Sequence, residues 1–282
     1  MQVIDMRMEK ISSNILQALI LTKNEEPNIA RVLDRLTWLE KVVILDSYST
    51  DHTIEIVKSF PNVEVNYRAF DTFAQQCNYG LDLIQSDWIL SLDADYVLTD
   101  EFVDETKALL QRDEKGIVAY FTKFEFLIYG KRLVGNNTTP RAVLFRKGRG
   151  VYFDDGHAHR LHINGVSGSY RAKIWHDDRK SLSRWMSNQD KYSIRECEKL
   201  LDPANPERSS IINRIRRTKV LAPFVVFFYC LFIKGLFLNG WAGWYYTLQR
   251  TMVEIVFALR MIEEEHLLRG DYQNRNVKNK EL

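Results

Sequence analysis

The chain has 282 residues, of which 45% are hydrophobic and 27% are charged, and its formal net charge is +2. This length and composition predict a folded protein with one large domain, or one domain with an extension. The small net charge gives no indication of a nucleic-acid partner, so none is expected. The three cysteines lack the spacing of metal ligands or of a disulfide framework, which favours reduced thiols in a cytosolic protein.

The N-terminal residues 1–14 mix charged side chains with apolar ones. They lack the uninterrupted apolar core of a secretory signal. We therefore expect the protein to stay on the cytoplasmic side of the membrane.

The first part of the chain alternates between short apolar runs and helical patterns. Strands are expected at residues 16–21, 42–45, 63–67 and 88–92. Pro27 suits the first turn of the first helix, and Ser49 or Thr50 suits the N-cap of the second. A further helix is expected from about residue 73 to 84. This alternation predicts an α/β fold with a mostly parallel sheet and right-handed crossovers.

Polar side chains follow each expected strand, where ligands of such sheets bind. They are Thr22, Asn24, Glu25, Asp46, Asp93 and Asp95. The first strand is followed by neither a G-x-G-x-x-G nor a G-x-x-x-x-G-K-[ST] sequence. The sequence thus lacks both the dinucleotide fingerprint and the P-loop.

Asp93 and Asp95 are two residues apart at the end of an apolar run, so on an extended segment their side chains would point the same way. Two close carboxylates repel, and the pKa of one should rise unless a cation neutralises the pair. Oxygen ligands of this kind suit Mg2+ or Mn2+. The plainer alternative is that both aspartates only end the strand and solvate a turn.

The second part of the chain is less regular. Thr99 is a natural N-cap for a helix reaching about residue 110, and strands are expected at 118–126, 142–145 and 170–174. A helix is expected over about 182–201, followed by a linker at 202–206. We therefore expect one domain over residues 1–201.

The C-terminal region, residues 202–282, is expected to be helical and hydrophobic. From residue 220 to 249 the only charged side chain is Lys234, and several arginines lie just upstream. The uninterrupted apolar run, 220–233, is shorter than the ~20 residues of a spanning helix. With basic flanks and interfacial aromatics, this region is expected to dip into a membrane or lie on it. The alternative is a hydrophobic hairpin packed on the domain or on a partner subunit.

Three segments together resemble the inverting glycosyltransferases of family 2. They are A-L-I-L-T-K-N-E-E from residue 18, V-I-L-D-S-Y-S-T-D from residue 43 and S-L-D-A-D from residue 91. The resemblance implies the GT-A fold, and it is nearest to the bacterial branch of lipopolysaccharide-core and cell-surface polysaccharide enzymes. It implies a nucleotide-diphosphate sugar as donor and a divalent metal, Mg2+ or Mn2+. It also implies that residues 1–201 form a catalytic domain, with a nucleotide half over about 15–110 and an acceptor half over about 111–201.

The resemblance also implies roles for individual residues. Thr22, Asn24 and Glu25 would line the nucleotide pocket, and Asp46 would accept hydrogen bonds from the base or ribose. Asp93 would contact the ribose or the metal, and Asp95 would bind the metal directly. His176 is a candidate third ligand, or else a donor to phosphate or a capped surface residue.

The catalytic base is expected in the second half of the chain, opposite the departing diphosphate. Asp155, His157 and His159 are the candidates, beside Asp154. The chain departs from the family pattern at Tyr96, where relatives often carry an acidic residue. It also has no Q-x-x-R-W sequence of the kind found in processive synthases, which argues for transfer of a single sugar.

The expected function is transfer of one sugar to a lipid-linked or lipopolysaccharide-type acceptor. The expected place is the cytoplasmic face of the inner membrane, with the protein peripheral or monotopic. Two other functions stay open: a sugar-phosphate nucleotidyltransferase, and a non-catalytic membrane-surface scaffold that kept the fold. The sugar, the nucleotide, the acceptor and the oligomeric state are not predicted.

Overall fold

A computed structural model of the chain describes residues 10–135, 139–155, 158–202 and 210–278, with only the backbone described at 155, 158–159 and 267–278. The chain forms two compact units. Unit 1 comprises the described residues up to 132 and from 139 to 180. Unit 2 comprises residues 133–135 and the described residues from 181 onward. The helix over residues 182–201, which was expected in the first domain, lies in unit 2, so the two units divide at residues 180/181 and not at 201/202.

Unit 1 is built on a seven-stranded sheet with the order β12-β6-β9-β4-β1-β2-β3. Strands β1 to β4 are parallel to their neighbours among themselves, whereas β9 is antiparallel to both β4 and β6. The sheet is therefore mixed, in agreement with the expected mostly parallel α/β fold of GT-A type. Its strands are β1 (Leu16–Thr22), β2 (Val42–Asp46), β3 (Val63–Tyr67), β4 (Trp88–Asp93), β6 (Ile117–Thr122), β9 (Arg141–Arg146) and β12 (Val166–Ser169).

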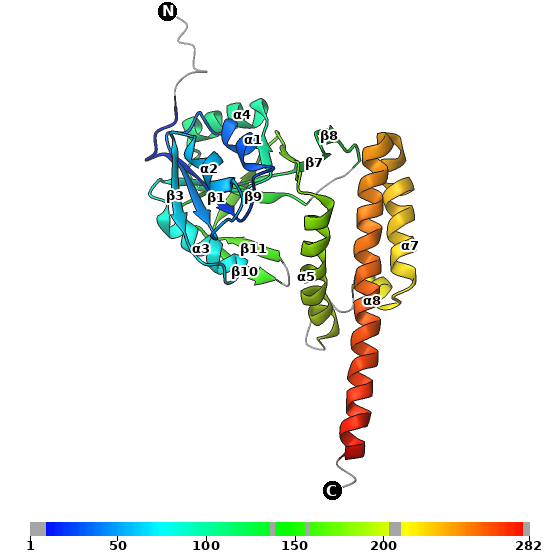
Figure 1. Cartoon of the computed structure of the whole chain (residues 1–282). Helices are drawn as coiled ribbons and strands as arrows, with labels where there is room; N and C mark the ends of the chain where they lie inside the picture. The colour runs from blue at the N-terminus through cyan, green and yellow to red at the C-terminus, as the bar shows by residue number, and fades with distance from the viewer. Residues whose placement is uncertain (1–9, 136–138, 156–157, 203–209, 279–282) are drawn as a thin grey trace, which may run out of the picture. The chain divides into compact units, whose positions relative to one another are not determined.

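The two faces of the sheet are covered differently, because successive side chains along a strand point to opposite faces. In β1, Ala18 and Ile20 pack with helices α1 (Ile29–Asp34), α2 (Thr53–Lys58) and α4 (Asp100–Arg112). Leu19 packs on the other face, against α3 (Phe73–Leu83) and the ribbon of β10 (Gly150–Asp155) and β11 (Ala158–Ile163). Figure 1 shows α1 and α4 on one side of the sheet and α3 with the ribbon on the other.

A small second sheet begins just beyond β4. Its order is β5-β13-β7-β8, from β5 (Tyr96–Leu98), β13 (Ile174–His176), β7 (Phe124–Ile128) and β8 (Lys131–Arg132). The register of β13 on β5 sets His176 opposite Tyr96. This sheet corrects two expectations: residues 118–126 form two strands instead of one, and the strand expected at 170–174 is replaced by β12 and β13.

The strands β1 to β4 and the helices after Thr72 and Thr99 agree with the sequence prediction within one or two residues. The N-cap expected at Ser49 or Thr50 was wrong. Helix α2 begins at Thr53 without a side-chain cap, and the Ser49 hydroxyl bonds to Asp46 instead.

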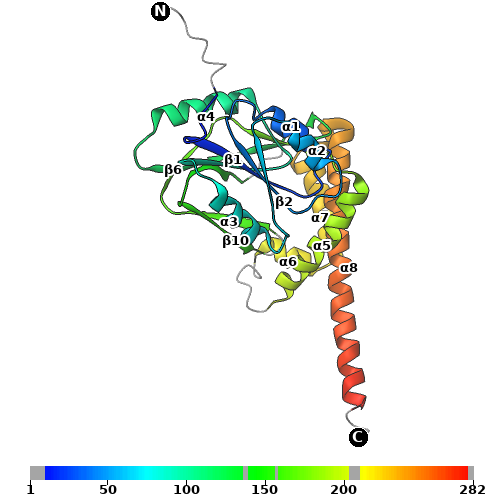
Figure 2. The ribbon, with the colours of Figure 1, turned by 60° about the vertical axis from the view of Figure 1, so that its left-hand side comes forward.

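Unit 2 is helical. Its elements are α5 (Leu182–Leu201), α6 (Ile211–Arg217), α7 (Leu221–Phe228), the π-helical turn η2 (Tyr229–Ile233), the 3-10 turn η3 (Leu236–Asn239) and α8 (Gly240–Lys278). Helix α7 lies alongside the first part of α8, and α8 continues well beyond it (Figures 1 and 2). Helix α5 packs on α8 through Cys197, Leu200, Phe257 and Met261.

Within the described residues, no single helix is both long and apolar enough to cross a membrane. One bent pair, Leu221–Ile233 with Leu236–His266, meets that requirement jointly by length and composition, with a bend of 69° between its parts. The pair exposes many large apolar side chains. They include Leu221, Phe224, Val225, Phe228, Phe232 and Ile233 before the bend and Phe237, Leu238, Trp241, Trp244 and Leu248 after it.

Candidate functional site

Asp46 ends β2 with a fully buried carboxylate. It accepts hydrogen bonds from the Thr22 hydroxyl at 2.7 Å, the Ser49 amide at 2.7 Å and the Ser49 hydroxyl at 2.6 Å. Both of its oxygens are therefore used inside the protein. The structure brings Thr22 and Asp46 together as expected, and these bonds hold the loop after β2; the expected contact of Asp46 with the nucleotide stays a prediction.

The loop after β1 is fastened to the same loop after β2. Asn24 adopts a left-handed backbone, with φ of 56°, and its side-chain oxygen accepts a hydrogen bond from the Thr50 amide at 2.6 Å. The Lys23 ammonium donates to the backbone oxygen of Ser47 at 2.8 Å. Asparagine tolerates this backbone region better than most residues. Asn24 thus joins the two loops, and its side-chain oxygen is already engaged.

Two tyrosines form an exposed aromatic surface beside these loops. The ring of Tyr48, just after β2, stacks on that of Tyr67, which ends β3, with centroids 5.9 Å apart and an angle of 22°. Both side chains are exposed. An exposed ring at the carboxyl end of a parallel sheet is a suitable surface for a nucleobase. The sequence analysis missed this pair, although Tyr48 lies within the motif that was recognised.

The chain turns between Asp93 and Asp95, so the two do not lie on one extended strand as expected. Asp93 is the exposed last residue of β4, whereas Asp95 lies in the turn before β5. Asp95 reaches His176 instead, with 3.2 Å between its Oδ2 and the imidazole Nε2. The other oxygen of Asp95, Oδ1, is buried and has no hydrogen-bond partner.

The charges of Asp95 and His176 stabilise each other. Burial acts to raise the pKa of Asp95, but the charge and hydrogen bond of His176 and the charge of Lys180 outweigh it, so the pKa is lowered. Burial acts to lower the pKa of His176, but the charge and hydrogen bond of Asp95 outweigh this effect, so the pKa is raised. The pKa rise expected for one of the two aspartates is thus not found at Asp95, because cationic side chains already lie beside it.

A second ion pair lies next to this one. Lys180 contacts Glu25 at 3.0 Å and Asp178 at 3.4 Å, and the side chains of Lys180 and Glu25 are only 12% and 13% exposed. The pKa of Glu25 is raised by burial, against the effect of Lys180. The charge of Lys180 also acts on Asp95. Glu25, Asp95, His176 and Lys180 therefore converge, although they come from three separate parts of the chain.

Arg141 supplies another positive charge. Its guanidinium donates a hydrogen bond of 3.1 Å to the Tyr96 hydroxyl. The pKa of Arg141 is raised by Tyr96 and, against burial, by the nearby carboxylates of Asp93 and Asp95. Arg141 and Lys180 follow no spacing pattern in the sequence, because each reaches the cluster only through the folding of the small sheet and of strand β9 in the mixed sheet.

Asp177, which follows β13, serves the structure. Its carboxylate is buried and accepts from Arg31 at 3.0 Å, from Arg179 at 2.9 Å and from the Gly130 amide at 3.1 Å. This carboxylate fixes the segment that carries Lys180 onto α1 and the turn after β7. The Asp177 carboxylate is thus engaged in holding this segment in place.

The three candidates for the base fall in the turn between β10 and β11. His157 lies outside the described residues, and for Asp155 and His159 only the backbone is described. Their assignment stays a prediction. The neighbouring Asp154 is described, and its carboxylate accepts from the Ala74 amide in the first turn of α3 at 3.1 Å. Asp154 therefore binds the start of a helix.

A divalent metal was expected at Asp93, Asp95 and His176. Among the described residues, no three acidic, histidine or cysteine side chains are gathered closely enough to hold a metal by themselves. The donor atoms still fit an ion that takes part of its ligands from a bound substrate, as Mg2+ commonly does. The buried, unpartnered Oδ1 of Asp95, next to an imidazole nitrogen, is the observation that supports this fit.

Comparison with known proteins agrees with this geometry. The model of a family described as "Glycosyl transferase family 2" matches residues 18–171. An uncharacterized glycosyltransferase of Rickettsia felis is 28% identical over 165 residues, which are 50% of this chain and 56% of that protein. The chain thus spans about half the length of that relative.

Another match covers nearly the whole chain. The lipopolysaccharide core biosynthesis glycosyltransferase LpsC of Rhizobium meliloti is 21% identical over 262 residues, which are 90% of this chain and 94% of that protein. Among solved structures, S. aureus TarS 1-349 in complex with UDP-GlcNAc has a TM-score of 0.44 and 12% identity, covering 90% of this chain and 92% of that one.

Proposed function

The chain belongs to glycosyltransferase family 2, and from this we propose that it transfers a single sugar from a nucleotide-diphosphate sugar to a lipid-linked or lipopolysaccharide-type acceptor. The observation that carries the proposal is the convergence of Glu25, Asp95, His176 and Lys180 beyond the carboxyl ends of β1 and β4. Ligands of open α/β sheets bind at this edge.

The nucleotide is proposed to bind over the loops after β1 and β2. The buried Asp46 keeps both loops in place, and the exposed ring of Tyr48 offers a stacking surface for the base. Polar contacts to the base or ribose are proposed to come from Asp46, with a further contact to the ribose from Asp93 at the exposed end of β4. Thr22 and Asn24 contribute indirectly, through the loop shape that they hold.

The diphosphate is proposed to bind beside Lys180 and Arg141. Both cations already lie next to the carboxylates of the site, so they can bind phosphate oxygens after small side-chain movements. Asp95 and His176, with Asp93, are the residues that would hold a divalent metal. When bound, Mg2+ or Mn2+ would neutralise charge on the departing diphosphate.

Inversion requires a group that takes the proton from the acceptor hydroxyl as this oxygen attacks the sugar. Asp155, His157 and His159, in the turn of the β10–β11 ribbon, remain the proposed source.

The acceptor is proposed to be lipid-linked and the protein to work at the cytoplasmic face of the inner membrane. The support is the exposed apolar face of α7 and early α8, which includes Phe224, Phe228 and Trp244. Soluble monomers rarely expose a contiguous apolar surface of this kind. The alternative, in which the face packs against a partner subunit, predicts a stable oligomer without lipid.

The proposal is tested by a thermal-shift screen of nucleotide sugars, each with and without Mn2+. A ligand that binds only the folded state raises the melting temperature. We expect one donor class to raise it, and more so with Mn2+. The Asp95→Asn variant should lose the Mn2+-dependent part of the shift. If no nucleotide sugar stabilises the wild type while a sugar phosphate with a nucleoside triphosphate does, the nucleotidyltransferase alternative is favoured.

A further inference from the structure

Helix α6 carries Arg214, Arg216 and Arg217, and it directly precedes the bent pair that contains α7 and α8. One of its arginines is fixed: Arg216 contacts both carboxylate oxygens of Glu254, at 2.8 to 3.2 Å. Glu254 is buried in α8, and its carboxylate is only 2% exposed. A buried ion pair with this geometry holds its two elements in register. Helix α6 therefore has a set position on α8.

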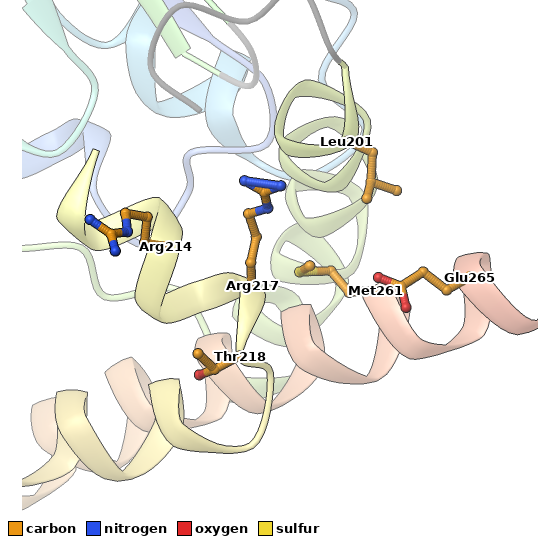
Figure 3. Close-up of a pocket in the computed structure, with 6 residues that line it drawn as sticks. All are labelled: Leu201, Arg214, Arg217, Thr218, Met261 and Glu265. Atoms are coloured by element: carbon orange, nitrogen blue, oxygen red, sulfur yellow. The ribbon is translucent and has the colours of Figure 1, made fainter. Parts of the chain in front are cut away.

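A cavity of about 500 Å³ lies between α6, the end of α5 and α8. Figure 3 shows the side chains that line it, with Arg217 extending from α6 toward the end of α5. Its lining is Leu201, Arg214, Arg217, Thr218, Met261 and Glu265. Two of these side chains are apolar, and two carry guanidinium groups. The cavity therefore suits a ligand with both an anionic and an apolar part.

The charge of this cavity is positive. Its single carboxylate, Glu265, already pairs with the ammonium of Lys219. Within the described part of the chain, Arg214 and Arg217 form no ion pair, and both are exposed. Guanidinium groups bind phosphate oxygens through paired N–H donors. The cavity thus offers two cations to an anion, with no carboxylate left to compete.

The exposed apolar face begins directly beside the cavity. Thr218 lines the cavity, and two residues later Val220 starts a run of exposed apolar side chains. Leu221 and Phe224, on the first turns of α7, are 57% and 60% exposed. A molecule whose phosphate lies against Arg214 and Arg217 can lay its hydrocarbon part along α7. A free phosphate ion would contact only the two arginines and would make no use of the apolar surface of α7.

We propose that this cavity binds the phosphate-bearing headgroup of a membrane lipid, with Arg214 and Arg217 on the phosphate and the lipid chain along α7. The proposal rests on the membrane location given under the proposed function, and it adds a defined headgroup site to it. Basic residues near an anionic membrane surface each add about a fivefold gain in binding. Removing both arginines should therefore lower binding to anionic vesicles by roughly 10- to 30-fold.

The test is sedimentation of the full chain with vesicles of phosphatidylcholine alone or mixed with phosphatidylglycerol, at physiological salt. The variant is Arg214→Gln with Arg217→Gln. The matched control is Lys191→Gln with Arg195→Gln, which removes two exposed charges of α5 in the same unit. We expect the wild type and the control to prefer the anionic vesicles by a similar factor, and the α6 variant to lose that preference.

Three results would overturn the proposal. Equal loss in both double variants would mean that the attraction is diffuse charge and not a site. Stabilisation of the protein by inorganic phosphate, lost in the α6 variant while vesicle binding is kept, would assign the cavity to a free phosphate. If the wild type does not bind vesicles, the cavity does not take its ligand from a membrane. Donor stabilisation is measured on the same samples and reports on the proposed transferase function separately.

Discussion

At the scale of single residues, Lys180 is the side chain on which we expect the proposed donor site to depend most. It lies nearly buried between Glu25 and Asp178, and its charge reaches Asp95. Burial acts to lower the pKa of Lys180, and the surrounding carboxylates outweigh it, so the pKa is raised and the ammonium stays charged. The diphosphate proposed to bind here would therefore meet a charged ammonium group.

We predict that Lys180→Met weakens binding of the nucleotide sugar by about 10- to 100-fold, because a hydrogen bond to a charged group contributes about 1.5–3 kcal/mol. Titration calorimetry with the donor found by the thermal-shift screen measures this. Lys173→Met is the control, since Lys173 is an exposed partner of Glu125. Lys180→Arg keeps the charge and should keep most of the affinity. Unchanged affinity in Lys180→Met would contradict the role given to this residue.

Single-residue roles were only partly predictable from the sequence. The positions of Asp46 and Asp93 at strand ends follow from the apolar runs before them, and the structure confirms both. The partners of Asp46 do not follow, because Thr22 and Ser49 meet it only when two parallel strands pair in register. Lys180 and Glu25 form an ion pair although they are 155 positions apart in the sequence, and no local pattern predicts a contact over such a separation.

At the scale of elements, the bend between α7 and α8 depends on close backbone contact. A Cβ atom on Gly243 would lie 1.8 Å from the backbone oxygen of Leu236. Nearby, Asn239 accepts a hydrogen bond of 2.8 Å from the Val134 amide and donates one of 3.3 Å to the Val134 oxygen. The turn thus depends on the absence of a side chain at Gly243, which allows the close approach, and on the side-chain amide of Asn239, which binds the loop 133–135.

Gly243→Ala should destabilise unit 2, by about 1–3 kcal/mol or more, because the backbone of the turn must move to admit the methyl group. Helix propensity alone predicts the opposite sign, since alanine is favoured over glycine inside a helix by about 1 kcal/mol. Hydrogen exchange of α7 and early α8 measures the change, with Gln249→Ala as a control in the same helix. Slower exchange in Gly243→Ala than in the wild type would contradict the close contact.

Elements with a long apolar run or a clear cap were predictable. Helices α4 and α5 begin after Thr99 and Ser181, whose hydroxyls accept from the first turn. The three-residue strands β5 and β13 were missed. Such short strands carry too few residues for a periodic signal, and they are held by pairing with distant segments. This omission led to the extended arrangement expected for Asp93 and Asp95.

At the scale of the whole molecule, two units divide the proposed tasks. The family match, residues 18–171, falls within unit 1 apart from the short loop 133–135, and unit 1 holds the donor-site cluster. Unit 2 holds the exposed apolar face of α7 and early α8, and the cavity lined by Arg214 and Arg217. The linker composition at 202–206 is visible in the sequence, whereas the packing of α5 on α8, which assigns α5 to unit 2, is not.

The central claim is that the cluster around Asp95 serves transfer of a sugar from a nucleotide to a lipid-borne acceptor. The most direct measurement incubates the full chain with labelled nucleotide sugars and bacterial inner-membrane vesicles, and follows label into the lipid-extractable fraction. The account predicts incorporation from one donor by the wild type, its loss in EDTA, and no incorporation by Asp95→Asn with a cooperative melting transition retained. Incorporation by Asp95→Asn at the wild-type rate would contradict the account.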